Sequence, residues 1–266
     1  SLLRPATARV SRDAAGSGRH GLHVDGDGMR MDITAHCIAL ADGRSSRGRK
    51  ALGIDAQTHT YQNPLLTMFA PRTFDDPRND VHVFLTPNGI VSVIPRIHGE
   101  WKIGFPASRA SLRGWTDAEP AELAGRLTEL VPFLDGIEPR FAGIYPVAMV
   151  NAATWRDGNC VLLGDACHAL HPGRSQGMNV ALRGVARLAE LLQRSVFPAA
   201  GVPEVLTAFE AELKPPIDAR LDDNHQRGLA MDGMDADSVQ RMHAAMAQLA
   251  DSPEALHRYC MNSAGH

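Results

Sequence analysis

The sequence predicts an α/β protein, in the broad sense that includes α+β, with a mixed or antiparallel sheet and C-terminal helices. Residues 1–43 and 60–110 are rich in short apolar runs typical of β-strands. Residues 159–196 read as a short apolar strand, a loop rich in proline and glycine, and a helix. Beyond residue 203 the pattern is helical, so strands and helices alternate only in part.

The β-rich stretches carry recognisable turn signals. Residues 22–34 alternate apolar and polar side chains, and Asp25-Gly26 and Asp27-Gly28 offer hairpin turns. In the second stretch, Pro87-Asn88-Gly89 predicts the turn between two strands. Both stretches are therefore expected to form antiparallel strands.

The first clear helix is expected within residues 116–134. Thr116 or Asp117 is its candidate cap, and its apolar stripe is Leu123, Leu127 and Leu130. In the C-terminal helical region, Lys214-Pro215-Pro216 predicts a break, because proline lacks the N–H that a helix interior needs.

Composition and charge exclude several classes of protein. The chain has 266 residues, 44% hydrophobic and 21% charged, which is ordinary for a soluble globular protein. A net charge of −3 gives no basic surface for nucleic acid or an anionic membrane. No apolar run reaches the roughly 18 residues of a membrane span, and the first ten residues lack a signal peptide's apolar core. The 4 cysteines are scattered, so reduced thiols and a cytoplasmic location are expected.

Residues 16–21, GSGRHG, match the dinucleotide-binding pattern G-x-G-x-x-G literally. That pattern carries its function only between an apolar strand and a helix. Here the polar stretch ARVSRDAA precedes it, and a strand-like alternation follows. We therefore interpret it as a hairpin loop and not as a nucleotide site.

A second candidate begins where the apolar residues Ile38 to Leu40 run into Asp42-Gly43, followed by a basic, hydroxyl-rich turn and Arg49. Aspartate can accept hydrogen bonds from a sugar hydroxyl, glycine lets backbone approach a ligand closely, and arginine can bind phosphate. Taken alone, these residues also fit an ordinary Asp-Gly turn at a strand end.

The third candidate, residues 164–179, is the most specific. An aspartate follows a buried strand, where open α/β sheets place ligand-contacting groups, and the Pro/Gly loop after it can lie flat against a planar ligand. The next helix would present free N–H groups toward negative charge. A strand–loop–helix joint without ligand remains the alternative. The candidate positions are Gly164, Asp165, Pro172, Gly177, Met178 and Asn179.

Together, ALADGRSSRGRKALGI and LLGDACHALHPGRSQGMN resemble the Asp-Gly and Gly-Asp motifs of the single-component FAD-dependent monooxygenases, the para-hydroxybenzoate hydroxylase-like family. The resemblance covers about residues 22–230, since VHVFLTPNGIVSVIP and WKIGFPAS are similar to that family's substrate-domain sheet. It implies an FAD/NAD(P)-binding fold of this type. The implied parts are residues 1–59 (remaining FAD-binding domain), 60–150 (substrate-binding sheet), 151–230 (Gly-Asp motif and following helices) and 231–266 (helical tail).

The resemblance also implies roles for the candidate residues. Asp165 would hydrogen-bond the ribityl chain of FAD, Pro172 would lie beside the isoalloxazine ring, and residues 177–179 would face its pyrimidine edge. Asp42 and Gly43, with Ser46, Arg47 or Arg49, would help to hold the diphosphate.

The implied reaction is a hydroxylation. NADPH or NADH reduces FAD, oxygen adds to the flavin C4a, and the hydroperoxide inserts one oxygen atom into a small aromatic or apolar substrate. The flavin carries this chemistry, and no catalytic side chain is assigned.

The chain departs from the family pattern in three places. No βαβ unit precedes its first strands, so the fold is expected to be incomplete at the N-terminus, with a separate N-terminal chain or fragment as a candidate partner. The glycine usual in the loop is Ser175, and the acidic residue usual five positions after Asn179 is Gly184. Two alternatives therefore stay open: a flavin-dependent reductase or dehydrogenase of the same superfamily, and a non-catalytic, flavin-free remnant.

Other clusters are less specific. Cys160, Cys167, His168 and His171 match no zinc-binding spacing, so no metal site is expected. The substrate is expected to lie among the strands of residues 60–106, although core packing explains the same side chains equally well. The lining candidates are Met68, Phe84, Ile94 and Phe105.

Overall fold

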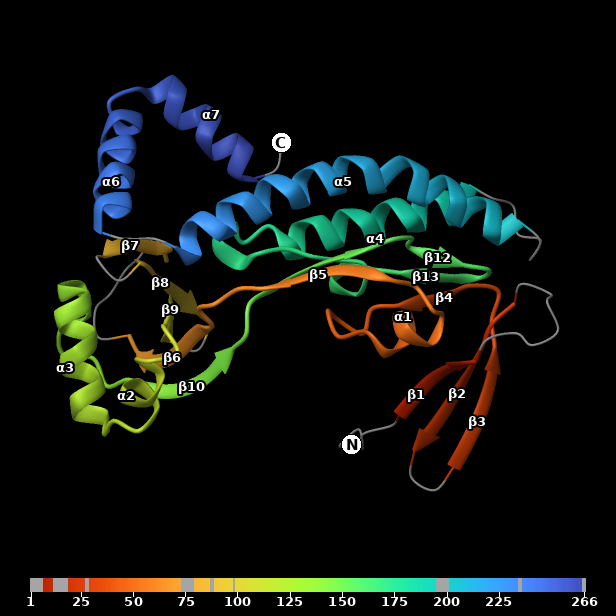
Figure 1. Ribbon diagram of the computed structural model, residues 1–266, viewed down its shortest axis with the longest axis horizontal. Coiled ribbons are helices and arrows are strands. Elements are labelled where there is room, and N and C mark those ends of the chain that lie inside the picture. Colours follow the sequence, from red (N-terminus) through yellow and green to blue (C-terminus); the bar gives the residue numbers. More distant parts are fainter. Residues whose placement is uncertain are drawn as a thin grey trace. The chain divides into compact units, whose positions relative to one another are not determined.

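A computed structural model describes residues 7–11, 19–26, 29–72, 79–86, 89–97, 99–194, 201–233 and 236–264 (Figure 1). The chain divides into two compact units. The first comprises Ser1–His59 and Ala148–Gln226, and the second comprises Thr60–Val147 and Arg227–His266. Residues 227–266 at the C-terminus thus belong to the same unit as residues 60–147.

The first unit contains three small sheets in its described residues, with strand orders β1-β2-β3, β14-β11-β5 and β12-β13-β4. Its strands are β1 (Thr7–Ser11), β2 (Gly21–Gly26), β3 (Met29–Thr34), β4 (Ile38–Leu40), β5 (Ala56–Thr60), β11 (Ala148–Ala152), β12 (Arg156–Asp157), β13 (Cys160–Leu162) and β14 (His168–Ala169). Its helices are α1 (Arg47–Ala51), α4 (Gly177–Arg194), the larger part of α5 (Val202–Asp232) and the short 3₁₀ turns η2 (Gly164–Ala166) and η3 (Pro172–Arg174).

The N-terminal strands are antiparallel, as the sequence predicts. Strand β2 pairs with β3 up to Gly26 and Met29, and residues 27–28 between them lie outside the described residues. The first half of GSGRHG, residues 16–18, also lies outside them, but its last residue, Gly21, begins the strand β2. A strand and not a helix therefore follows this motif, which argues against a dinucleotide site there.

Strands β4 and β13 position the two sequence motifs. They are parallel, with Ile38 opposite Cys160 and Leu40 opposite Leu162. The N–H of Leu163 continues the pairing by donating to the carbonyl of Leu40 at 2.9 Å. Because carboxyl ends of parallel strands meet at one edge of a sheet, the Asp-Gly and Gly-Asp turns leave from the same edge.

The second unit is built on a five-stranded antiparallel sheet with the order β10-β6-β9-β8-β7. Its strands are β6 (Leu65–Pro71), β7 (His82–Thr86), β8 (Gly89–Arg96), β9 (Glu100–Pro106) and β10 (Arg140–Tyr145). Its helical segments are α2 (Leu112–Thr116), α3 (Pro120–Leu130), η1 (Pro132–Leu134), α6 (Ala236–Ala250) and α7 (Pro253–Ala264). Thr86 pairs with Gly89, so β7 and β8 form the expected hairpin, whose turn residues 87–88 lie outside the described part.

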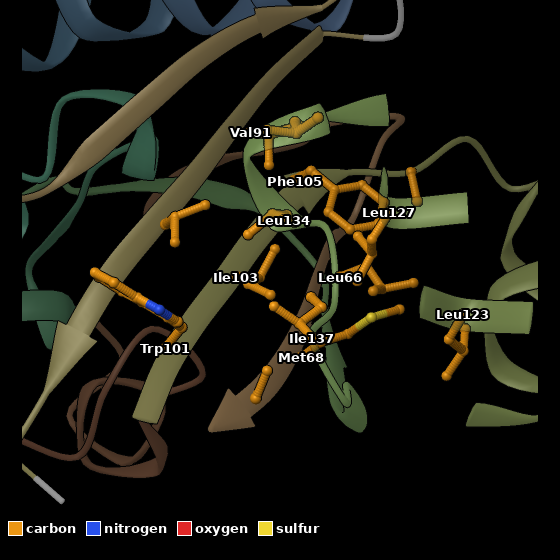
Figure 2. Packing of buried hydrophobic residues seen from close by; sticks show 14 residues of the cluster. Leu66, Met68, Val91, Trp101, Ile103, Phe105, Leu123, Leu127, Leu134 and Ile137 are labelled. Atoms are coloured by element: carbon orange, nitrogen blue, oxygen red, sulfur yellow. The ribbon is translucent and has the colours of Figure 1, made fainter. Parts of the chain in front are cut away.

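Helix α3 covers one face of this sheet. Figure 2 shows Leu123 and Leu127 beside strand residues that include Met68 and Phe105, all of them buried. Burial of each such side chain contributes about 1.5–3 kcal/mol. Met68 and Phe105 therefore belong to the core, which is the alternative to a substrate-lining role that the sequence left open for them. Phe84 packs against the same core.

The start of α3 differs from the expectation. The helix begins at Pro120, and Glu119 is its N-cap, whereas Thr116 and Asp117 end the preceding short helix α2. The capping prediction is therefore wrong. Proline is favoured at the first helical position, because its missing N–H needs no partner there, and this decides where the helix starts. The expected apolar stripe is confirmed: Leu123 and Leu127 are buried, and Leu130 packs against the core.

Helix α5 runs without interruption through Pro215 and Pro216, as Figure 1 shows, so the predicted break is wrong. Contacts within the first unit hold the helix on both sides of the prolines. Before them, Glu210 accepts a hydrogen bond from the N–H of Trp155 at 2.7 Å. After them, Asn224 bonds to the backbone at residue 171. Tertiary contacts thus override the local preference.

Candidate functional site

The Asp-Gly turn after β4 is closed by side chains of the turn itself. Asp42 Oδ2 accepts a hydrogen bond from the N–H of Gly48 at 2.9 Å, and Ser46 Oγ, the N-cap of α1, accepts one from the N–H of Arg49 at 2.9 Å. Burial raises the pKa of the Asp42 carboxyl, but hydrogen bonds from Gly48 and Ser46 outweigh it and lower the pKa below its usual value. Gly43 has φ +78°, which glycine adopts without strain.

Arg49 lies inside the first unit and not at its surface. Its side chain is 4% exposed. Nη1 donates to the carbonyl of Ala166 at 2.6 Å, and Nη2 donates to the carbonyl of Arg44 at 3.1 Å. Since Ala166 belongs to the Gly-Asp turn, Arg49 links the two motifs. Of the hydroxyl and basic candidates near Asp42, Ser46 is also buried, and Arg47 is exposed.

The Gly-Asp turn η2 presents a single carboxylate outward. Gly164 has φ +57°, and a Cβ on it would lie 3.3 Å from the Cβ of Ala181 in α4. Glycine therefore lets the turn approach the helix closely. Asp165 is exposed, whereas Ala166 and Cys167 are buried.

The loop between β14 and α4 is fixed from α5. The N–H of His171 donates to Oδ1 of Asn224 at 2.6 Å, and Nδ2 of Asn224 donates to the carbonyl of His171 at 3.1 Å. His171 Nδ1 in turn accepts from the N–H of Gly173 at 3.1 Å. Pro172 is exposed at the surface of this loop.

Ser175 ends the loop in a left-handed conformation, with φ 52° and ψ 28°. Its N–H donates to the carbonyl of Pro172 at 2.9 Å. Residues with a Cβ rarely adopt this conformation, and glycine adopts it freely. The structure thus gives a physical reason for the glycine that the family pattern has at this position.

The first turn of helix α4 is exposed to solvent. Met178 is 71% exposed, Asn179 is exposed, and no heavy atom lies within 4 Å of where a Cβ on Gly177 would project. The other side of the helix buries Val180 and Leu188. The first turn of this 18-residue helix is therefore exposed, and the first N–H groups of a helix have no carbonyl partner within it.

Two titratable groups beside the turn are neutral. His168 is 3% exposed, and burial lowers the pKa of its imidazole. Burial raises the pKa of the Cys167 thiol far above its usual value. A thiol in this state is a poor nucleophile, so the pair gives no Cys-His catalytic centre. Within the described ranges, no three His, Cys, Asp or Glu side chains gather as metal ligands.

Residues 8–223 match the family described as FAD binding domain. The chain belongs to this family. The ubiquinone hydroxylase UbiL of Rhodospirillum rubrum is 30% identical over 200 residues, which are 69% of this chain and 43% of that protein. The pentachlorophenol 4-monooxygenase of Sphingobium chlorophenolicum is 25% identical over 201 residues, 75% of this chain and 37% of that protein.

The solved structure of p-nitrophenol 4-monooxygenase from Pseudomonas putida DLL-E4 has the same fold. It aligns with a TM-score of 0.75 at 18% identity, over 97% of this chain and 65% of that chain. The predicted fold class and the resemblance to the para-hydroxybenzoate hydroxylase-like family are therefore confirmed. The chain spans less than half the length of the two relatives.

The residues of the site fit the flavin side of FAD, the cofactor of this family. Gly43 and Gly177 leave the space beside their Cα atoms open, with no heavy atom within 4 Å of a projected Cβ. Asp165 offers an exposed acceptor for ribityl hydroxyls, and exposed Pro172 and Met178 offer apolar surface for a planar ring. A polar acceptor and an apolar surface are what the ribityl chain and the flat, partly apolar ring of FAD require.

Sequence reasoning missed Asn224, although a signal was present. Ile217, Leu221 and Asn224 are all buried and recur at helical spacing. An amide in an apolar stripe is unfavourable unless it is hydrogen-bonded. A polar residue at such a position therefore indicates a specific partner.

Proposed function

We propose that this chain is the flavin- and substrate-facing part of an FAD-dependent monooxygenase. The whole protein would insert one atom of O₂ into a small aromatic or apolar substrate, with NADH or NADPH as reductant. One observation carries the proposal: the parallel pair β4 and β13 delivers both motifs to one sheet edge, where Arg49 links them through Ala166. The hydroxylase and monooxygenase names of the relatives support the reaction class.

In this proposal the chain's residues bind and orient the cofactor. Asp165 would accept hydrogen bonds from the ribityl chain, and Pro172 would pack beside the ring system. Gly177, Met178 and Asn179 would place the first N–H groups of α4 near the electron-rich pyrimidine edge, which the helix dipole favours. Bound FAD would supply hydride acceptance and the reaction with dioxygen.

Asp42 and Gly43 would hold the turn that approaches the diphosphate. The Asp42 carboxylate is used to close that turn, through its bond from Gly48. We assign Arg49 to the placement of the two motifs and not to phosphate, because its guanidinium already donates to two backbone carbonyls. Arg47, which is exposed, is the better candidate for an anionic group.

We place the substrate against the face of the five-stranded sheet that is opposite α3. Thr67, Gly104 and Ser92 lie in one cross-strand row there. Ile94, Lys102 and Phe69 form the next row on the same side. The buried Thr67 hydroxyl, which has no hydrogen-bond partner in the described part of the chain, would bind a polar substituent.

The proposal includes a separate N-terminal chain or fragment as partner. Among the described strands, β4 ends its sheet, and its other edge has no strand beside it. A strand at the edge of a sheet presents unpaired backbone N–H and C=O groups to which another strand can bind. A further parallel strand would pair with this edge of β4.

A cytoplasmic location is also part of the proposal. It is supported by Cys37, Cys160 and Cys167, which are free thiols in the structure. None of the helices in the described ranges is long and apolar enough to cross a bilayer.

The test is flavin retention by the purified chain. FAD is added, the sample is desalted, and the visible flavin band is measured for wild type, Asp165→Ala and the exposed control Asp135→Asn. We expect wild type and control to retain flavin and Asp165→Ala to bind about tenfold more weakly, since a charge-assisted hydrogen bond is lost. Retention that Asp165→Ala leaves unchanged would contradict the assigned site.

A folded chain that retains no flavin would contradict a self-sufficient enzyme. The same titration with a co-expressed N-terminal chain then tests the partner. Incorporation of ¹⁸O from ¹⁸O₂ into an aromatic substrate, coupled to NADPH oxidation, supports the monooxygenase. NADPH oxidation without such incorporation would identify the reductase alternative instead.

A further inference from the structure

We infer that Asn224 is a positioning residue for the loop of residues 170–175, the loop that faces the flavin in the proposed function. The function of the loop rests on that proposal. The way in which Asn224 holds the loop rests on the geometry alone, so the two parts can be tested separately.

Asn224 uses both halves of its amide on one residue. Oδ1 accepts from the N–H of His171 at 2.6 Å, and Nδ2 donates to the carbonyl of His171 at 3.1 Å. The side chain is 3% exposed, so water does not compete for these bonds. A carboxamide carries a donor and an acceptor bonded to the same carbon, which matches the N–H and C=O of one backbone residue. A strand-like pairing therefore forms between one side chain and one backbone residue, across 53 positions of sequence.

Two further hydrogen bonds are local to the loop. His171 Nδ1 accepts from Gly173, and the N–H of Ser175 donates to Pro172. These bonds set the shape of the loop but not its position against the helix. Arg174 does reach α5, at 3.5 Å from Asp223, but this carboxylate is more than half exposed, and exposed ion pairs contribute little. Asn224 thus supplies a buried, two-bond contact by which α5 holds the loop in position.

Replacing Asn224 should leave α5 in place. On the other side of the prolines, the Glu210 carboxylate accepts from the Thr154 hydroxyl at 2.6 Å and from the N–H of Trp155 at 2.7 Å. Lys214 adds a bond to Asn151 at 3.4 Å. The helix is therefore anchored independently of residue 224, and the effect of a substitution is local to the loop.

The stability gained from such a pair of bonds is small, since a buried hydrogen bond contributes about 1 kcal/mol net. An apolar side chain would fill the stripe of Ile217 and Leu221 at least as well. The amide instead fixes the position of the backbone at His171, next to Pro172. In the proposed function the flavin ring packs on Pro172, and a displacement of that residue by about 1 Å would weaken the contact and change the orientation of the ring.

The experiment is hydrogen exchange of the flavin-free chain, comparing wild type, Asn224→Ala, Asn224→Asp and the control Asp222→Asn. Asp222 is exposed and lies on the same turn of α5. We expect amide exchange in residues 170–175 to rise about tenfold in Asn224→Ala, and exchange at residues 154–155 to stay unchanged. Asn224→Asp keeps an acceptor for the His171 N–H but sets a second oxygen against the His171 carbonyl, so loop exchange should rise in this variant too. Asp222→Asn should match wild type.

Two results would overturn the positioning role. One is loop exchange that Asn224→Ala and Asn224→Asp both leave at the wild-type rate. The other is an equal rise at residues 154–155 in Asn224→Asp, which would make Asn224 a residue of general stability.

FAD affinity of the same variants tests the other half of the inference. An approximately tenfold weaker affinity in Asn224→Ala, with Asp222→Asn unchanged, supports it. Flavin binding that is equal in all variants despite a freed loop would contradict the contact between loop and flavin. Absence of binding in every variant, including wild type, would count against the proposed function and leave the exchange result standing.

Discussion

Arg49 Nη1 donates a 2.6 Å hydrogen bond to the carbonyl oxygen of Ala166, 117 residues later in the chain. The bond joins the turn after β4 to the turn after β13. Strand pairing brings these turns to one edge, but pairing ends at Leu163 and does not fix their mutual position beyond the sheet. A buried guanidinium with a planar set of donors can do so, since it binds two carbonyls in one plane.

Replacing Arg49 should therefore destabilise the first unit and loosen the site together. We expect Arg49→Met to lower the free energy of unfolding by about 3 kcal/mol, because one buried and one partly buried bond from a charged donor are lost. Arg49→Lys should recover little, since an ammonium cannot reproduce the fork. Urea unfolding measures both. Arg47→Met, at the exposed neighbour, should change stability by less than about 0.5 kcal/mol; an equal loss there would refute the assignment.

Ser175→Gly should stabilise the chain. Ser175 has φ 52°, and a left-handed residue with a Cβ costs about 1–2 kcal/mol. Part of the gain is offset because glycine is freer in the unfolded chain, so we expect an increase of about 0.5 kcal/mol. Ser175→Val should lower stability, since β-branched side chains tolerate this conformation worst. Thermal unfolding of the three proteins provides the measurement, and a stabilising valine would exclude backbone strain as the cause.

Two buried glycines on helices should respond oppositely to alanine. No heavy atom lies within 4 Å of a Cβ on Gly184 of α4, whereas a Cβ on Gly48 of α1 would lie 2.9 Å from Leu40 Cδ1. We expect Gly184→Ala to raise the free energy of unfolding by about 0.5–1 kcal/mol through helix propensity, and Gly48→Ala to lower it. Chemical denaturation of both variants tests this, and a destabilised Gly184→Ala would show that the site has no room for a methyl group.

The sequence was sufficient to place Asp42 and Asp165 at strand ends. Each follows a short apolar run and adjoins a glycine, and this local pattern needs no knowledge of distant residues. The burial of Arg49 could not be predicted, since arginine is normally exposed and its partner Ala166 is remote in sequence. Asn224 likewise acquires its role only when α5 packs beside the loop.

What the sequence left open or predicted wrongly has the same origin. Alternation along β6 and β9 gives two faces, but it does not say which face α3 covers, so the sequence could not decide whether Met68 and Phe105 line a site or belong to the core. The prolines of α5 predict a break from local chemistry, and contacts made by Glu210 and Asn224 keep the helix continuous. Local patterns predicted the types of the elements and the ends of the strands. Tertiary packing decided which face of the sheet is covered and whether helix α5 is continuous.

Stability should fall below pH 6.5 in a way that depends on His168. Burial lowers the pKa of this imidazole beneath its ordinary value of 6.5, against the smaller raising effect of the nearby carboxylates Asp165 and Asp218. Because the folded pKa is the lower one, the unfolded chain binds the proton more readily. The stabilising contribution is therefore complete above pH 6.5 and is lost as the pH falls below it, at most by about 1.4 kcal/mol per pH unit.

His168→Phe removes this titration and keeps a ring of similar size beside Trp155, whose ring centre is 5.2 Å away. Urea unfolding at pH 7.5 and pH 5.5 should show a smaller loss on acidification for His168→Phe than for wild type. The exposed His257 serves as control, and His257→Gln should follow wild type at both pH values. Equal losses in wild type and His168→Phe would mean that the buried ring takes up its proton without unfolding, contrary to the desolvation that its burial implies.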